Sequence, residues 1–300
     1  MTSPSSGPAR QDNSMWKFGG LTFRELGRRV VRDIQVNELF ERASGLAFDF
    51  LLGLFPLLFI LLAAFDLFAS YSLQLRTNLL AYFADLLPTL AFQLLNRITG
   101  ELAANTSREK LTIGIFVGLW LVSTGVASII SSLNVAFRIK ESRSWFKVRA
   151  VALGLTLVIS ILILWAMCIV LLSGDFVDWL GKELQWASAM ILIGKALQWP
   201  TAVVFVIFSY ALIYHFGPDL PDRQWQWMTP GSVFAAILWL AASVGFRVYL
   251  RFVNNYTVIF GSLGAAIILL VWLYVTGLAF LIGGEINATI ERAAAENVHG

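Results

Sequence analysis

Six long apolar segments constrain what this 300-residue chain can fold into. They lie near residues 46–68, 111–133, 148–173, 196–216, 230–252 and 257–284. A helix needs about 20 apolar residues to cross the ~30 Å hydrocarbon core of a bilayer. A barrel strand would alternate apolar and polar residues, and these segments do not alternate. A lipid-exposed backbone must also satisfy its own hydrogen bonds. The expected fold class is therefore all-α, a polytopic membrane protein with six transmembrane helices.

The composition supports membrane insertion and gives no indication of nucleic-acid binding. Hydrophobic residues make up 58% of the chain and charged residues only 14%, whereas soluble proteins carry about 25% charged residues. The net charge of +3 is explained by Lys and Arg in cytoplasmic loops. The single cysteine, Cys168, lies within an apolar run, so no intramolecular disulfide can form.

The distribution of Lys and Arg predicts the orientation. If the N-terminus is cytoplasmic, 14 of the 22 Lys and Arg residues fall on the cytoplasmic side. This bias places both termini in the cytoplasm. Residues 1–14 contain no hydrophobic core region, so no cleavable signal peptide is expected.

The remaining segments complete the predicted domain organisation. Leu26, Val30 and Leu39 recur at helical spacing among arginines, which predicts an amphipathic helix on the anionic cytoplasmic face. A second apolar stretch, residues 72–104, is interrupted by Pro88 and by charged residues, which indicates that it packs at the outer interface of the membrane. The expected parts are a disordered N-terminal tail (1–15), a cytoplasmic amphipathic segment (16–45), a six-span membrane domain (46–292) with an outer interfacial insertion (69–110), and a C-terminal tail (293–300).

No residue pattern indicates an active site. The only histidines are His215 and His299, and the chain contains no HExxH, GxSxG, Walker or cysteine-cluster motif. We therefore predict that the protein is not an enzyme, and that it has no catalytic, cofactor-binding or metal-binding residues.

Several polar side chains near or within the spans are candidates for function. Asp49 lies about one turn inside the first predicted span, where it is either a proton site or, as we favour, a charge that reaches the interface. Hydroxyl groups that could line a cavity belong to Ser123, Thr124, Tyr210 and Tyr256. A stripe of small residues in the second span predicts close helix packing through Gly114, Gly118, Gly125 and Ser128.

Glu285 lies beyond the last apolar segment. That segment is centred near residue 270, so Glu285 lies about 22 Å from the centre at ~1.5 Å per residue. This exceeds the hydrocarbon half-thickness of about 15 Å and indicates an interfacial carboxylate. We expect it to pair with a basic residue of the loop 134–149, with Arg143 as the first choice, while Asn287 fixes the helix end.

Four stretches resemble the YihY/BrkB family of bacterial inner-membrane proteins. They are "GLAFDFLLGLFPLL", "LWLVSTGVASIISSLNVAFRIKESRSWFKVR", "IYHFGPDLPDRQWQWMTPGSVFAAILWL" and "NNYTVIFGSLGAAIILLVWLYVTGLAFLIGGEINATIE". The most specific positions are Asn134 with Arg143, Gly217-Pro218, Pro230-Gly231, and Glu285 with Asn287. The resemblance implies six spans in the bacterial inner membrane, no cofactor and a transport-like role. Asp49 departs from the aromatic residues typical of the family.

Two functions remain open. The first is a transporter or flippase-like protein that moves an amphipathic solute or a lipid across the membrane. The second is a non-transporting scaffold or envelope-assembly protein. The expected partners are the lipid bilayer and a lipid or small amphipathic solute, with no nucleic acid. The family once carried the label of a tRNA-processing enzyme, ribonuclease BN, and this sequence offers no metal-ligand constellation to support that activity.

The predicted orientation can be tested with single cysteines. After Cys168→Ser, a cysteine at Leu220 should react with an impermeant thiol reagent only in opened membranes, because this loop is assigned to the cytoplasm. A cysteine at Asp85 should react in intact spheroplasts. Labelling of both positions from the same side would contradict the orientation.

Overall fold

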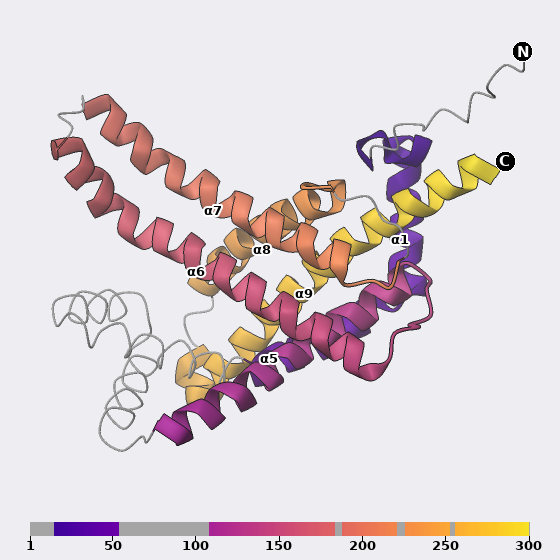
Figure 1. Ribbon diagram of the computed structural model, residues 1–300, viewed down its shortest axis with the longest axis horizontal. Helices are drawn as coiled ribbons and strands as arrows, with labels where there is room; N and C mark the ends of the chain where they lie inside the picture. Colours follow the sequence, from indigo (N-terminus) through magenta and orange to yellow (C-terminus); the bar gives the residue numbers. More distant parts are fainter. Residues whose placement is uncertain (1–14, 54–107, 184–187, 221–225, 253–255, 300) are drawn as a thin grey trace, which may run out of the picture.

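The computed structural model describes residues 15–53, 108–183, 188–220, 226–252 and 256–299. These residues form helices joined by turns and loops, with no strand among them. The elements are η1 (Met15–Gly20), α1 (Phe23–Val36), a helix that runs from residue 39 to residue 53, where the described part stops, α5 (Arg108–Ala136), α6 (Trp145–Glu183), α7 (Ser188–Phe216), α8 (Pro230–Phe252) and α9 (Tyr256–His299) (Figure 1).

Four helices contain segments long and apolar enough to cross a membrane, counted over the described residues. They are Phe116–Ala136, Trp145–Ile163, Pro230–Leu250 and Ala266–Asn297, and Pro200–Phe216 is a shorter apolar helix. The five apolar segments expected from residue 111 onward coincide with α5 to α9. The first expected span, 46–68, is described only to residue 53, and most of the insertion 69–110 lies outside the described residues. The all-helical prediction is confirmed, and the number six stays a prediction.

The N-terminal segment differs from a single amphipathic helix lying on lipid. α1 begins at the cap Thr22, whose Oγ1 accepts a hydrogen bond from the Glu25 backbone at 3.3 Å. It ends before Glu38, which has a φ of 54°. The next helix then begins at residue 39. Leu26 and Val30 pack in one cluster with α9 side chains, so the apolar face of α1 lies against protein.

Residues assigned to both expected tails belong to helices in the structure. Met15 belongs to η1 and is buried, whereas residues 1–14 lie outside the described part of the chain. α9 continues without interruption to His299. Residues 293–299 are therefore helical. This part of the helix is stabilised by packing, because α9 continues beyond the last span to contact η1 and α1.

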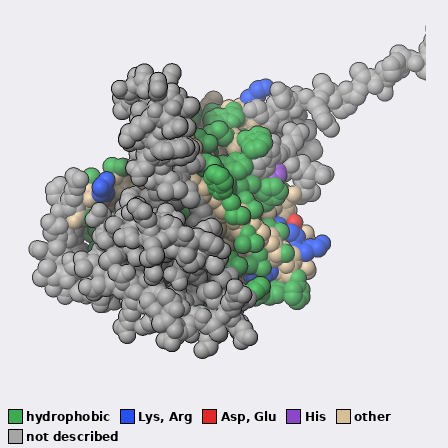
Figure 2. Space-filling view, turned by 60° about the vertical axis from the view of Figure 1, so that its left-hand side comes forward, with side chains coloured by type: hydrophobic (Ala, Val, Ile, Leu, Met, Phe, Trp, Pro, Cys, Tyr) green, Lys and Arg blue, Asp and Glu red, His purple; other side chains and the backbone are tan. Residues whose placement is uncertain are grey.

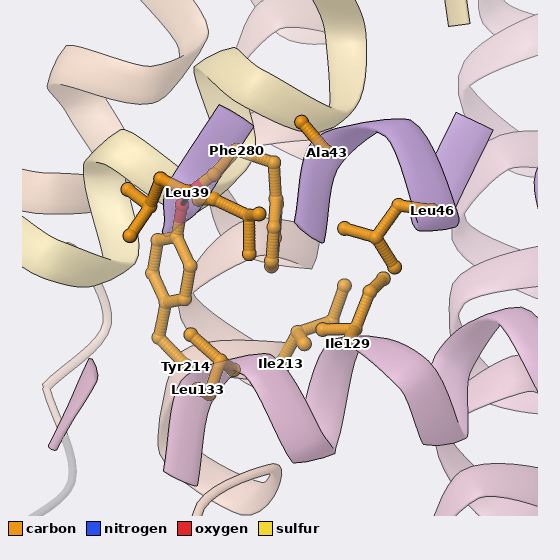
Figure 3. Packing of buried hydrophobic residues seen from close by; sticks show 9 residues of the cluster. Leu39, Ala43, Leu46, Ile129, Leu133, Ile213, Tyr214 and Phe280 are labelled. Carbon is orange, nitrogen blue, oxygen red and sulfur yellow. Dashed lines mark hydrogen bonds between the residues drawn. The ribbon is translucent and has the colours of Figure 1, made fainter. Parts of the chain in front are cut away.

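The main core joins four helices near the end of the molecule that carries both described termini (Figures 1 and 3). The helix 39–53, α5, α7 and α9 contribute the buried cluster Leu39, Ala43, Leu46, Ile129, Leu133, Ile213, Tyr214, Phe280 and Leu281. The hydroxyl group of Tyr214 donates a hydrogen bond of 2.5 Å to the Phe280 carbonyl. Elsewhere many large apolar side chains are exposed, as the hydrophobic surface in Figure 2 illustrates. This pattern fits helices that face lipid.

Glycines bring the start of α8 onto α9. A Cβ added at Gly231 would lie 2.1 Å from the Gly283 carbonyl oxygen. A Cβ added at Gly283 would lie 2.5 Å from the Gly231 carbonyl oxygen and 2.6 Å from the Tyr214 hydroxyl oxygen. The two backbones therefore touch, as small residues permit in membrane helices.

Alanine at either position should destabilise the protein. Gly231→Ala and Gly283→Ala should each cost about 1–3 kcal/mol or more, because the obstructing atoms are backbone and cannot rotate away. Thermal unfolding in detergent measures the effect. Gly245→Ala, also on α8, is the control, since no described atom lies within 4 Å of the added Cβ. Equal melting temperatures for all three variants would show that α8 and α9 are not in close contact.

Candidate functional site

Glu285 is the most deeply buried acidic residue that the sequence singled out, with 0% of its surface exposed. Its Oε1 accepts a hydrogen bond of 3.0 Å from Arg292 Nη2, and its Oε2 accepts one of 2.9 Å from Asn37 Nδ2. Glu285 and Arg292 are seven residues apart on α9, which places them on one helix face. Asn37 follows α1. The carboxylate thus joins α9 to the break between α1 and the helix 39–53.

A second buried carboxylate, Asp33 of α1, shares the same arginine. Its oxygens accept hydrogen bonds from Arg292 Nη2 at 2.6 Å, Arg32 Nε at 3.1 Å and Arg138 Nη2 at 3.4 Å. Arg292 also donates to the carbonyl of Ala136, the last residue of α5. We call Asp33, Asn37, Arg138, Glu285 and Arg292 the carboxylate clamp. Its charges compensate each other, which buried charges require.

The predicted partner of Glu285 was therefore wrong. Arg143 pairs with Glu141 and Asp219, and Arg292 takes the place beside Glu285. The sequence placed α9 and the loop 134–149 on the same side, and Arg138 of that loop does reach the clamp. Arg292 lies two turns along the same helix, so it is positioned to pair with Glu285 by local geometry alone.

Arg143 instead organises a second polar cluster between the α5–α6 loop and the end of α7. It binds Glu141 through Nε at 2.7 Å and Nη2 at 2.8 Å, and it donates to the Gly217 carbonyl at 2.8 Å. Asn134 donates to Glu141 at 2.7 Å and accepts from the Asp219 backbone at 2.9 Å. We call these residues the loop cluster.

The loop cluster stabilises the charged forms of both its carboxyl groups. Hydrogen bonds from Arg143 hold the pKa of Glu141 below its ordinary value, against the opposing effect of burial. The side-chain and backbone hydrogen bonds from Ser142 lower the pKa of Asp219. Two depressed carboxyl pKa values next to an arginine are typical of a structural ion-pair network.

Asn287 anchors the start of α8. Its Oδ1 accepts a hydrogen bond from the Gly231 backbone at 2.9 Å, and its Nδ2 donates to Thr229 Oγ1 at 2.9 Å. Thr229 and Ser232 exchange side-chain to backbone hydrogen bonds of 3.1 Å around Pro230. The first turn of a helix leaves backbone N–H groups without acceptors inside the helix. Asn287 supplies the acceptor for one of them, the N–H group of Gly231.

Asp49 contacts α5 within the apolar part of that helix. Its carboxylate accepts a short hydrogen bond from the Ser128 hydroxyl. Ser128 lies eight residues, or about 12 Å, before Ala136, the last residue of α5. Beside this pair, a Cβ at Gly125 would lie 3.2 Å from the Phe50 ring. The half-buried Asp49 carboxylate therefore lies well inside the C-terminal end of α5.

The other predicted residues do not gather into one site. Ser123 is buried and donates to the Trp120 carbonyl, whereas Thr124 is exposed and accepts a hydrogen bond from Arg149. Tyr210 packs edge-to-face on Phe280 in the core. Gly114 and Gly118 lie within α5, and Gly118 is buried. The side chain of Tyr256 and the surroundings of Gly114 fall outside the described residues.

Two polar groups near the middle of α8 were not predicted. Trp239 Nε1 and Ser243 Oγ are buried and have no hydrogen-bond partner within the described part of the protein. They lie one turn apart, close to the midpoint of the segment Pro230–Leu250. A Trp and a Ser in an apolar run give little signal, because such residues are also common on lipid-facing surfaces. Only their burial distinguishes them.

Asp33, Asn37 and Arg292 were likewise missed as functional candidates. The acidic and basic residues of 16–45 looked like the polar face of an interfacial helix. A signal was nevertheless present, because Asp33 falls on the same helical face as the buried Leu26 and Val30. Among the described residues, no group of three His, Cys, Asp or Glu side chains is arranged to hold a metal ion.

Comparisons with known proteins agree with this architecture. The family model described as "Virulence factor BrkB" matches residues 30–300. The "Putative ribonuclease-like protein YfkH" of Bacillus subtilis is 30% identical over 253 residues, which covers 84% of this chain and 90% of that protein. A UPF0761 membrane protein of Cronobacter sakazakii is 30% identical, covering 86% of this chain and 85% of its own. One from Tolumonas auensis is 25% identical, covering 83% and 79%. No solved structure matches.

The apolar helices and these relatives define an α-helical membrane protein embedded in a lipid bilayer. The chain belongs to the BrkB family, which includes the expected YihY proteins, and the resemblance found in the sequence is confirmed. Glu285, Asn287, Asn134 and Arg143, the positions that carried it, are the residues that form the polar contacts described above.

The clamp predicts energetic coupling between Glu285 and Arg292. Arg292→Gln should destabilise the protein by a few kcal/mol, because it leaves the buried Glu285 without a cationic partner. Glu285→Gln should cost less, since Arg292 keeps Asp33 as a partner. Together they should cost less than the sum, by about 1 kcal/mol or more. The measurement is a double-mutant cycle of thermal or denaturant stability in detergent.

Arg143→Gln combined with Glu285→Gln is the matched control. Those two effects should add, because Arg143 belongs to the loop cluster. Additive effects in the Glu285–Arg292 cycle, or coupling between Glu285 and Arg143, would contradict the assignment.

Proposed function

We propose that this protein is a transporter or flippase-like protein of the bacterial inner membrane, acting on an amphipathic solute or a lipid. The observation that carries the proposal is the hydrogen bond between Asp49 and Ser128 within the apolar part of α5. An ionisable residue in the hydrocarbon region is costly, so such residues usually mark ion or substrate pathways. Here the carboxylate is half-buried and lies beside a face of small residues.

The polar atoms of Trp239 and Ser243 support the same proposal. A buried donor without a partner costs about 1–3 kcal/mol, and lipid tails supply no acceptor. A water or the polar part of a transported molecule would satisfy both groups. Their position near the middle of α8 is where a molecule crossing the bilayer must leave its hydration behind.

The helix arrangement also agrees with movement. The carboxylate clamp, the loop cluster and the main core join the helices near the end that carries the described termini. In Figure 1 the α6–α7 pair diverges from α5 and α9 toward the opposite end. A bundle joined firmly at one end can change its width at the other by a hinge-like motion of its helices.

The alternative is a non-transporting scaffold or envelope-assembly protein. The backbone contact between α8 and α9 at Gly231 and Gly283 favours it, because such close packing resists rearrangement. The many exposed apolar side chains would then serve for lateral contact with other membrane proteins. The two functions differ in a measurable quantity, the rate at which a solute or lipid crosses the bilayer.

The proposal includes six spans with both termini in the cytoplasm. The bias of Lys and Arg supports this orientation. The clamp supports it too, since α1, the end of α9 and the loop after α5 meet at one end of the molecule. The first span would be completed by residues beyond 53.

Lipid movement can be measured in vesicles of phosphatidylethanolamine and phosphatidylglycerol that contain a trace of fluorescent phospholipid. Dithionite bleaches about half of the label in protein-free vesicles, and the purified protein should raise this fraction. Asp49→Asn should slow the change at least several-fold, because it removes the ionisable group that binds Ser128 within the apolar part of α5. Gly245→Ala is the control. A bleached fraction that stays at one half, together with no flux of entrapped amphipathic solutes, would favour the scaffold.

We also propose that the protein is not an enzyme, although its relative YfkH bears a ribonuclease-like name. Metal-dependent nucleases hold their ions with clustered carboxylates or histidines, and the chain has two histidines in all. Highly purified protein should leave tRNA intact with Mg²⁺, Mn²⁺ or Zn²⁺ present. Metal-dependent cleavage that disappears on mutating a residue of this chain would contradict the proposal.

A further inference from the structure

The outward face of α1 carries a row of arginines. Arg24, Arg28 and Arg32 are spaced four residues apart, so they follow one side of the helix, and all three are exposed. The opposite side is occupied, since Leu26 and Val30 pack against Ile286 and Ile290 of α9. The apolar face of this amphipathic helix therefore packs against α9, and its basic face is exposed.

The same face borders a cavity of about 470 Å³. Its lining residues are Glu25, Arg28, Arg29, Arg32 and Glu296. The two acids are already engaged, because Arg29 binds Glu25 at 3.2 Å and Glu296 at 2.9 Å. Arg28 makes no hydrogen bond or ion pair with another described residue. Arg32 contacts Asp33 through Nε, and its exposed terminal nitrogens make no hydrogen bond with another described residue. The cavity thus presents guanidinium donors suited to an oxyanion.

The clamp fixes the depth of α1 relative to the bilayer. Arg292 bonds both Asp33 of α1 and the carbonyl of Ala136. Ala136 is the last residue of α5 and of its apolar stretch, and the loop that follows carries Arg138 and Lys140. Such a change from apolar to charged residues marks the edge of the hydrocarbon core. α1 therefore lies where the hydrocarbon ends and the phospholipid headgroups begin, and Figure 1 shows it across the C-terminal part of α9.

Apolar side chains accompany the arginines. Val31 is 61% exposed and Val36 is 63% exposed, and helical spacing places them on either side of the arginine row. A basic helix face that also presents aliphatic groups is characteristic of helices that bind an anionic lipid surface. These apolar groups would not contribute to the binding of a soluble phosphate compound.

We propose that the arginine face of α1, formed by Arg24, Arg28 and Arg32 with the adjoining cavity, binds the phosphate groups of anionic phospholipids of the surrounding bilayer. Arginine suits this role because its planar fork can hold two phosphate oxygens. Arg32 also contacts Asp33, and Asp33 binds Arg292. A lipid bound to Arg32 is thereby linked to the clamp that joins α1, α5 and α9. This site is independent of the proposed transport function, since a scaffold could possess it equally.

The test compares phosphatidylglycerol with phosphatidylcholine, each titrated into the full-length protein in non-ionic detergent. Binding is followed by the rise in melting temperature at low and at high salt. The variant Arg24→Gln/Arg28→Gln spares Arg32, which contacts the clamp. Phosphatidylglycerol should stabilise the wild-type protein more than phosphatidylcholine does. The double variant should bind phosphatidylglycerol roughly 30-fold more weakly, from about 1 kcal/mol per arginine at a lipid surface. High salt should remove most of the preference.

The matched control is Lys140→Gln/Lys147→Gln, which removes the same charge from exposed residues elsewhere. It should leave the lipid preference intact, and Arg24→Lys/Arg28→Lys should retain most of it. Equal stabilisation by the two lipids, or equal losses in the arginine and lysine variants, would overturn the proposal. An equal rise in melting temperature with inorganic phosphate at the same concentration would show a soluble-anion site and also overturn it.

Discussion

The structure depends on two buried carboxylates that share one arginine. Glu285 and Asp33 are 0% and 1% exposed, and both accept hydrogen bonds from Arg292. Asp33 also binds Arg32 and Arg138, whereas Arg292 is the cation beside Glu285. Both carboxylates require these partners, since an isolated buried charge costs far more than a folded domain can supply. The Arg292 guanidinium also reaches the Ala136 carbonyl. One side chain therefore holds the N-terminal segment, α5 and α9 in a single arrangement.

Close backbone packing extends this arrangement to α8. Asn287 lies half a turn beyond Glu285 on α9, and it binds the first turn of α8 through the Gly231 N–H group. Gly283 lets the two backbones touch there. The stretch from Gly283 to Arg292 thus contacts α1, α5, α7 and α8, through glycines at one end and polar side chains at the other. In lipid, where apolar surfaces gain nothing by leaving water, such contacts supply the specificity of helix association.

This arrangement separates a firmly joined end from helices that mainly face lipid. Toward the termini the polar clusters and the main core combine. Farther along, α5, α6 and α8 expose many large apolar side chains. Asp49 and Ser128 lie beside the apolar part of α5, and Trp239 and Ser243 lie near the middle of α8. A function that requires movement would use this part of the molecule, because the clamp and the main core hold the helices together at the end that carries the described termini.

The sequence by itself determined the helical class, the apolar segments from residue 111 onward and the family. Membrane spans follow from local composition, because hydrocarbon accepts only internally bonded backbone. The residues Asn134, Arg143, Glu285 and Asn287 could be singled out from the sequence as well. Their partners could not, since an ion pair depends on which helices cross and at what level. Glu285 pairs with Arg292 of its own helix, whereas Arg143 binds Glu141 and the Gly217 carbonyl, just after the end of α7. Tertiary structure also decided that the apolar face of α1 lies on α9. The same amphipathic pattern fits a lipid surface or a protein surface, and only the packing of distant residues selects between them.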